Sequence, residues 1–141
     1  RIPCAACLVS CLASMDPMGG DIPIEREYLT HDISILKYVE EDDFHYKGMV
    51  RNRTAKEIQQ GIKAMMKALA DFAHPVYILH GADDHVCNPQ GASFIHDKIR
   101  SKVKLLKLYD GMYHEIFNEM EREMVFKDVV QFMQSQEMKL L

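Results

Sequence analysis

The sequence lacks a block of basic residues and any stripe in which basic and aromatic side chains alternate. Its formal net charge is −4, and the charges of both signs are interleaved, which argues against a nucleic-acid partner. The apolar stretch from Ile2 to Met15 is too short to span a bilayer. With 48% hydrophobic residues, the chain is not a disordered one. Its 141 residues can bury one modest core, so we expect one compact unit.

Cysteine is sparse, and its spacing indicates no complete metal site. Cys4, Cys7 and Cys11 could be metal ligands or contain a redox pair, but no second Cys pair or closely spaced His pair accompanies them. Their neighbours are small and apolar, which favours buried structural thiols. This cysteine usage suits a reducing compartment, so we expect a cytoplasmic protein, with membrane association as an addition. The sequence does not predict an oligomeric state.

The first half of the chain is predicted to be helical. Residues 4–15 fit a buried helix or an inner strand equally well. Thr30 is a candidate N-cap for a helix over residues 31–41, and Thr54 to Glu57 match a capping box that would open a long amphipathic helix. That helix has an apolar stripe, which faces either a core or a ligand: Ile58, Ile62, Met65, Met66 and Leu69.

The second half predicts a strand–helix–strand unit. Val76 to His80 is a short apolar run that begins after Pro75, and Val103 to Tyr109 forms a second one. Between the runs, Asn88 is a candidate N-cap with Pro89 at the first helical position. This is the length of one parallel βαβ unit, so the fold class is α/β. A final helix over residues 119–134 would bury Val125, Val129, Phe132 and Met133.

An acid and a histidine follow the two predicted strands. Asp84 comes three residues after Gly81, and His114 comes three residues after Gly111. Reactive groups gather at the carboxyl ends of parallel strands, so we expect these two side chains to face each other. Taken singly, the Asp would more often cap a turn and the His would face solvent. Asp83 would replace Asp84 if the loop contained a one-residue bulge.

Two stretches carry a resemblance to a known family. They are Pro75-Val-Tyr-Ile-Leu-His-Gly-Ala-Asp-Asp-His-Val-Cys-Asn-Pro-Gln-Gly-Ala and Leu106-Lys-Leu-Tyr-Asp-Gly-Met-Tyr-His-Glu. Together they resemble the closing third of an α/β-hydrolase of the monoacylglycerol lipase or lysophospholipase type, which is serine aminopeptidase S33-like. The resemblance implies that Asp84 is the acid and His114 the base of a catalytic triad. It also implies that residues 1–73 form part of a helical cap and residues 74–141 the C-terminal core segment.

The nucleophile of such a triad is not found in this sequence. No Gly-x-Ser-x-Gly occurs, and the family order of Ser, Asp and His would put the serine before residue 1. The chain begins with Arg, and we interpret it as a piece of something longer that is inactive alone. A degenerate, non-catalytic binding protein is the alternative. A third reading is a zinc hydrolase, since His80-x-Ala-x-Asp-His85 matches a binuclear zinc motif with Ala82 in place of one ligand.

The resemblance also implies a substrate class. It indicates hydrolysis of a lipid ester without a cofactor and without a metal, and a cap that could contact a membrane surface. Met65, Met66 and Leu69 are candidates for contact with the acyl chain. Cys87 lies in the loop after Asp84, near the start of the next helix, where positive partial charge would favour the thiolate, so it is a candidate reactive thiol.

Overall fold

The computed structural model of the chain describes residues 5–20, 23 and 25–137. They form two compact units where we expected one. Residues 1–24 and 46–69 make the first, here called the helical unit, and residues 25–45 and 70–141 make the second, here called the sheet unit. The expected division into a cap over residues 1–73 and a core segment over residues 74–141 stays a prediction.

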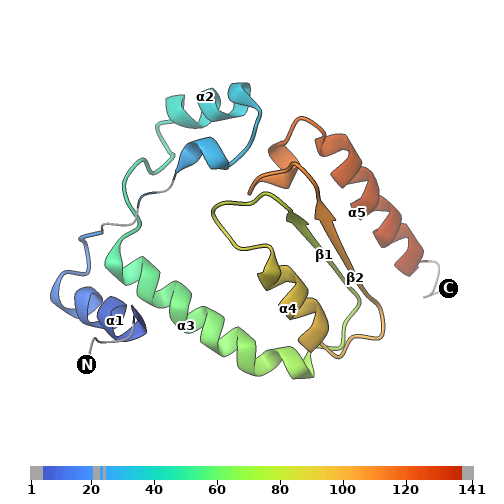
Figure 1. Cartoon of the computed structure of the whole chain (residues 1–141), viewed down its shortest axis with the longest axis horizontal. Helices are drawn as coiled ribbons and strands as arrows, with labels where there is room; N and C mark the ends of the chain where they lie inside the picture. The colour runs from blue at the N-terminus through green and yellow to red at the C-terminus, as the bar shows by residue number, and fades with distance from the viewer. Residues whose placement is uncertain (1–4, 21–22, 24, 138–141) are drawn as a thin grey trace. The chain divides into compact units, whose positions relative to one another are not determined.

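The helical unit consists of α1 (Ala5–Met15) and α3 (Asn52–Ala68), which pack against each other (Figure 1). Residues 5–15 are therefore helical and not an inner strand. The helix is not the buried one that we expected, because Leu12 and Met15 are exposed and, of the side chains described there, Ala13 alone is buried. The capping box predicted at Thr54 is wrong, because α3 begins three residues earlier than a cap at Thr54 implies, after Arg51, which makes no side-chain cap. Instead the first N–H groups of α3 donate to backbone: Asn52 N–H to Gly19 O (2.7 Å) and Arg53 N–H to Pro17 O (3.2 Å).

The apolar stripe of α3 is mostly exposed. Its members Ile58, Ile62, Met65 and Met66 are 40–54% exposed. Leu69, at the start of the 3₁₀ helix η2 (Leu69–Asp71), is buried at 7%. Within the described residues, a core-facing role therefore holds for Leu69 alone. No helix of the described residues combines the length and the apolar character needed to cross a bilayer.

The sheet unit is built on a parallel pair of strands. β1 (Val76–Gly81) pairs with β2 (Lys104–Tyr109) in a register that sets Val76 opposite Lys104 and Gly81 opposite Tyr109. The helix α4 (Gln90–Lys98) connects them, which confirms the predicted strand–helix–strand unit. Asn88 Oδ1 accepts a hydrogen bond from Gln90 N–H at 2.9 Å, so its side chain binds the first N–H group of α4. The helix begins one residue later than expected, with Pro89 at the N-cap position in place of Asn88.

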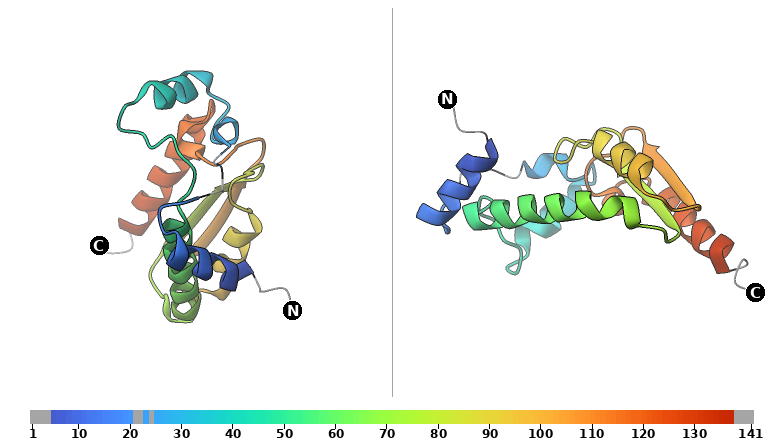
Figure 2. Two further views of the ribbon diagram at one scale, coloured as in Figure 1. Left: turned by 90° about the vertical axis from the view of Figure 1, so that its left-hand side faces the viewer. Right: turned by 90° about the horizontal axis from the view of Figure 1, so that it is seen from below.

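The helices α4 and α5 (Arg122–Glu137) lie on opposite faces of the sheet (Figure 2). On the α4 face, Lys104 Nζ donates to the carbonyls of His96 and Ile99 and so closes the C-terminal end of that helix. On the other face, the sheet packs on α5 through a small core, composed of Tyr109, Met112, Ile116 and Val125, with Leu79 against it.

The last helix differs from the prediction in two respects. It begins at Arg122, three residues later than expected. Val125 is fully buried, whereas Met133 is 59% exposed, so the predicted buried stripe does not extend to Met133. The residues before Arg122 form the 3₁₀ helix η3 (Ile116–Asn118) and a turn at Glu119, which keeps the chain after β2 close to the sheet.

Residues 25–45 contribute a 3₁₀ helix, η1 (Arg26–Tyr28), and the helix α2 (Ile33–Glu41) to the sheet unit. The predicted N-cap at Thr30 is wrong. Asp32 caps α2, since its Oδ1 accepts a hydrogen bond from Ser34 N–H at 3.0 Å, and Arg122 Nη1 donates to its Oδ2 at 3.0 Å. Thr30 instead donates its hydroxyl proton to Asn118 O at 2.8 Å.

A close backbone approach explains why a glycine ends β1. Gly81 has an ordinary backbone conformation, but a Cβ atom there would overlap the carbonyls of Met112 and Tyr113. The glycine therefore lets the loop after β2 cross next to the loop after β1. Those carbonyls belong to backbone that is itself hydrogen-bonded, since Asp83 N–H donates to Met112 O at 3.1 Å.

We predict that Gly81→Ala destabilises the protein by about 1–3 kcal/mol, the usual cost of overpacking a filled site. Gly91→Ala is the matched control, because a Cβ at Gly91, in α4, meets nothing within 4 Å and alanine favours a helix. That control should be neutral or slightly stabilising. Urea unfolding of both variants provides the measurement, and equal midpoints would contradict the close approach.

Candidate active site

The carboxyl group of Asp84 is buried at the carboxyl end of β1. Its side chain is 1% exposed, and its Oδ1 accepts hydrogen bonds from Val86 N–H (2.7 Å) and Cys87 N–H (2.8 Å). Burial acts to raise the pKa of Asp84, but these bonds, together with the hydrogen bond from His114, outweigh it and hold that pKa below its ordinary value. Asp84 is therefore ionised and firmly held at neutral pH.

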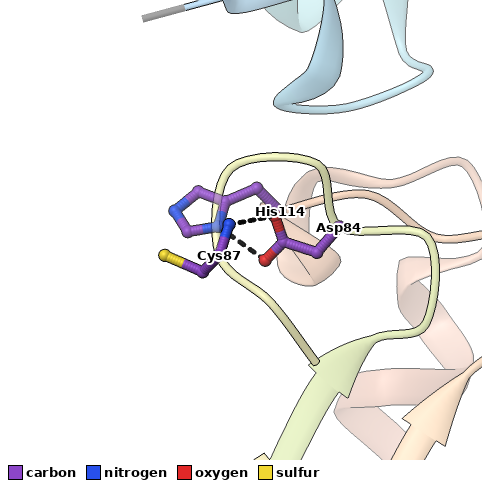
Figure 3. A group of neighbouring side chains, drawn as sticks. All are labelled: Asp84, Cys87 and His114. Carbon is purple, nitrogen blue, oxygen red and sulfur yellow. Dashed lines mark hydrogen bonds and ion pairs between the residues drawn. The ribbon is translucent and has the colours of Figure 1, made fainter. Parts of the chain in front are cut away.

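His114 reaches Asp84 from the loop after β2. The turn that leads to it passes through Gly111, whose φ of 74° lies in the left-handed region that favours glycine. His114 Nδ1 lies 2.8 Å from Asp84 Oδ2 (Figure 3). Because an ionised carboxylate only accepts, Nδ1 must carry the donated proton, which leaves Nε2 as the nitrogen that can take one up.

The structure thus brings Asp84 and His114 together, and it does not bring Asp83 to the histidine. Asp83 is exposed, while its backbone N–H is engaged with the loop after β2. The arrangement is that of a base oriented by an acid: the carboxylate fixes the tautomer of the imidazole and can stabilise its cation. The assignment of either residue to catalysis is taken up below as a proposal.

A second histidine also contacts this carboxylate and was not predicted to do so. His80 Nε2 lies 2.9 Å from Asp84 Oδ2 and 3.1 Å from Cys87 O. Since a carbonyl oxygen only accepts, Nε2 of His80 carries a proton, which it can donate to Cys87 O and to Asp84 Oδ2. The sequence held a weak signal, because His80 is the last side chain of the strand that ends at Gly81 and precedes Asp84 by four positions.

The residues of the zinc-like motif do not converge as a ligand set within the described part of the chain. His85 points its ring at Tyr28, with ring centroids 4.4 Å apart. The group there that could hold a metal ion is a different one, Asp84, Cys87 and His114, whose ligand atoms lie within 4.8 Å of one another (Figure 3). Two members of this group are Asp84 and His114 themselves, and the hydrogen bond between them already explains why their atoms lie so close.

Cys87 lies beside the pair but is not a favoured thiolate. Burial of the thiol and the negative charge of Asp84 raise the pKa of Cys87. This is opposite to the effect expected from the nearby start of α4, because a full charge at short range outweighs the partial charge of a helix end. Cys11 is a free, exposed cysteine, so the expectation that it is a buried structural thiol is wrong. Cys4 lies outside the described residues, and so does the side chain of Cys7.

A pocket of about 360 Å³ opens next to the histidine in the sheet unit. It is lined by residues of β1 and of the loop after β2: Leu79, His80, His114, Glu115, Ile116, Phe117 and Asn118. The candidate acyl contacts Met65, Met66 and Leu69 belong to the helical unit, and their role stays a prediction.

Comparison with known proteins gives a consistent picture. A sequence model of the family described as serine aminopeptidase, S33, matches residues 8–121. The monoacylglycerol lipase of Mycolicibacterium smegmatis is 25% identical over 131 residues, which cover 91% of this chain and 47% of that protein. The chain thus spans about half the length of this relative.

Two solved structures have the same fold. The monoacylglycerol lipase of Paleococcus ferrophilus superposes with a TM-score of 0.82 at 20% identity, over 96% of this chain and 53% of that one. A soluble variant of the monoglyceride lipase of Saccharomyces cerevisiae, in complex with a substrate analog, gives a TM-score of 0.78 at 24% identity, over 92% and 48%. The described residues therefore adopt part of an α/β-hydrolase fold, as the sequence predicted.

We predict that Asp84→Asn accelerates the labelling of Cys87 by maleimide at neutral pH. The substitution removes the charge that raises the pKa of the thiol, so a larger fraction is thiolate. Labelling rates can be read by peptide mass spectrometry. Cys11, in the helical unit, is the internal control and should keep its rate, whereas an unchanged rate at Cys87 would contradict the electrostatic coupling.

Proposed function

Because this chain belongs to the serine aminopeptidase S33 family and has part of an α/β-hydrolase fold, we propose that the protein carrying it is a serine-type carboxylic ester hydrolase. The observation that carries the proposal is the 2.8 Å contact between His114 Nδ1 and the buried carboxylate of Asp84. In this proposal Asp84 is the triad acid and His114 the base.

The chemistry follows from the tautomer. A serine Oγ attacks the ester carbonyl, and His114 Nε2 takes up the hydroxyl proton while the new C–O bond forms. Asp84 holds Nδ1–H in place and stabilises the imidazolium. When the tetrahedral intermediate collapses, the C–O bond to the alcohol breaks and His114 returns the proton to the leaving oxygen. Water then repeats the sequence on the acyl-enzyme and releases the carboxylic acid.

The nucleophile is proposed to come from outside residues 1–141. Family enzymes with this chemistry place the serine in a Gly-x-Ser-x-Gly elbow, and the sequence contains none. The relatives are about twice the length of this chain, which leaves room for such an element. In this account the 141 residues alone have an acid and a base but no group for them to activate, and they are inactive.

The proposed substrate is a monoacylglycerol or a lysophospholipid. The name of the mycobacterial relative supports the first of these, and the exposed apolar stripe of α3 offers contact area for an acyl chain. Met65 and Met66 on this stripe, with the buried Leu69 that follows α3, are the proposed contacts in a cap formed by residues 1–73, which would also touch the membrane surface that supplies the lipid. We further propose a cytoplasmic location and no cofactor.

A second candidate is a non-catalytic protein that binds a hydrophobic ligand without cleaving it. The missing serine motif is the observation that favours it. The two candidates differ in one respect that the upstream coding sequence would reveal, namely whether a Gly-x-Ser-x-Gly precedes residue 1.

We predict that a fluorophosphonate probe labels the full-length protein on one serine and does not label the isolated 141-residue chain. The probe reacts with a serine activated by the base, and the isolated chain has no elbow to present one. Hydrolysis of a nitrophenyl ester should show the same contrast. Ester turnover by the isolated chain that the probe abolishes would contradict the assignment of the nucleophile.

In the full-length protein, Asp84→Asn should lower kcat by about 10⁴-fold, because the asparagine favours the wrong tautomer of the base. His114→Ala should remove most of the turnover. Asp83→Asn is the matched control: it makes the same change at an exposed neighbour and should cost little. Steady-state kinetics on a monoacylglycerol decide the matter, and a mild Asp84 variant beside a damaged Asp83 variant would reverse the assignment.

A further inference from the structure

A second buried carboxylate, Glu119, lies in the sheet unit and has no part in the proposed chemistry. It is 1% exposed and sits between η3 and α5, five residues after His114. A buried carboxylate needs compensating donors, because its desolvation costs several kcal/mol. Its partners therefore indicate what this residue holds in place.

Three donors converge on Glu119. Its Oε1 accepts from Tyr113 N–H at 2.7 Å and from His31 Nδ1 at 3.0 Å, and its Oε2 accepts from His31 N–H at 3.0 Å. Burial acts to raise the pKa of Glu119, but these bonds outweigh it and lower that pKa, so the group is ionised at neutral pH. The hydroxyl of Thr30 is nearby, yet its single proton goes to Asn118 O.

One of these donors is the backbone neighbour of the base. Tyr113 directly precedes His114, so Glu119 fixes the peptide unit just before the residue whose imidazole must reach Asp84. The His31 ring, held by Glu119, also stacks on the ring of Tyr113, with centroids 3.7 Å apart. The carboxylate thus restrains Tyr113 from two sides, through its backbone and through its side chain.

The segment that contains His31 continues this restraint along the loop. His114 N–H donates to Tyr28 O (3.4 Å), and Glu115 N–H donates to Leu29 O (2.8 Å). The ring of Tyr28 packs against His85, the residue after Asp84, with centroids 4.4 Å apart. Residues 28–31 therefore contact both the loop of the acid and the loop of the base, and Glu119 anchors them to the latter.

We propose that Glu119 is a positioning residue for His114. It acts through Tyr113 N–H and through His31 to keep the imidazole in line with Asp84, and it touches neither substrate nor the reacting atoms. The proposal rests on the function assigned above for its meaning in catalysis. The positioning itself is a property of the folded sheet unit and can be measured without turnover.

The test uses Glu119→Gln in the full-length protein. The amide keeps the shape but turns an NH₂ group toward donors, so at least one of the three N–H groups loses its acceptor. Misplacement of a catalytic group by about 1 Å can cost about 10²-fold in rate, so kcat should fall by about that factor while KM changes little. The imidazole Nδ1–H proton of His114, read by NMR, should shift from its wild-type position.

Asp128→Asn is the matched control. Asp128 is a carboxylate on α5 that accepts hydrogen bonds from Tyr109 Oη at 2.7 Å and from Lys107, both on β2 rather than on the loop that contains His114. It should lower the unfolding temperature and leave kcat and the His114 signal unchanged. If Glu119→Gln likewise lowers only the unfolding temperature, the carboxylate is structural and the proposal is overturned.

A second variant keeps the test decisive if Glu119→Gln does not fold. His31→Ala removes one donor and the ring stacked on Tyr113, and it should give a smaller fall in kcat with the same kind of change in the His114 signal. An unchanged signal would overturn the proposal. Should the wild-type protein prove inactive, the proposed function fails, but the NMR comparison still decides whether Glu119 positions His114.

Discussion

The interaction on which the candidate site depends is the burial of the Asp84 carboxylate among donors at the end of β1. Backbone N–H groups of its own loop satisfy Oδ1, and two imidazoles, His114 and His80, approach Oδ2. Desolvation alone would push such a group toward its neutral form, so the charge persists only because every lone-pair direction finds a partner. Removing one partner would leave a buried charge that is only partly compensated.

This constraint extends to the backbone around it. The loops after β1 and β2 can lie in contact because Gly81 has no Cβ that would overlap the carbonyls of Met112 and Tyr113, and because Gly111 adopts a positive φ. The loop that contains His114 is also bound by Glu119, a second buried carboxylate, which accepts a hydrogen bond from Tyr113 N–H. Two buried carboxylates therefore hold the base: Asp84 binds the imidazole of His114, and Glu119 binds the backbone N–H of the residue before it. This restricts the motion of the imidazole, which suits a group that must transfer a proton in one geometry.

The two strands and the pair of Asp84 and His114 could be predicted from the sequence. Short apolar runs bounded by Pro75, Gly81 and Gly111 define β1 and β2. The resemblance to the hydrolase family, in which an acid and a histidine each follow a glycine by three residues, points to Asp84 and His114, which the structure brings together. Each glycine meets a backbone requirement: Gly81 faces the carbonyls of Met112 and Tyr113, and Gly111 has a positive φ.

What the sequence did not reveal was set by contacts between distant segments. Thr30 looks like an N-cap, but its hydroxyl is engaged by Asn118, 88 residues away, and Asp32 caps α2 instead. The start of α3 is fixed by the carbonyls of Pro17 and Gly19, which no local motif announces. Glu119 looks in the sequence like a surface residue at a charged helix start, and it is buried by contacts with His31 and Tyr113.

The most direct measurement of the central claim is a crystal structure of the full-length protein. We expect a serine Oγ within hydrogen-bond reach of His114 Nε2, about 2.6–3.2 Å or somewhat longer without substrate, whereas a structure with no serine facing that nitrogen would contradict the account.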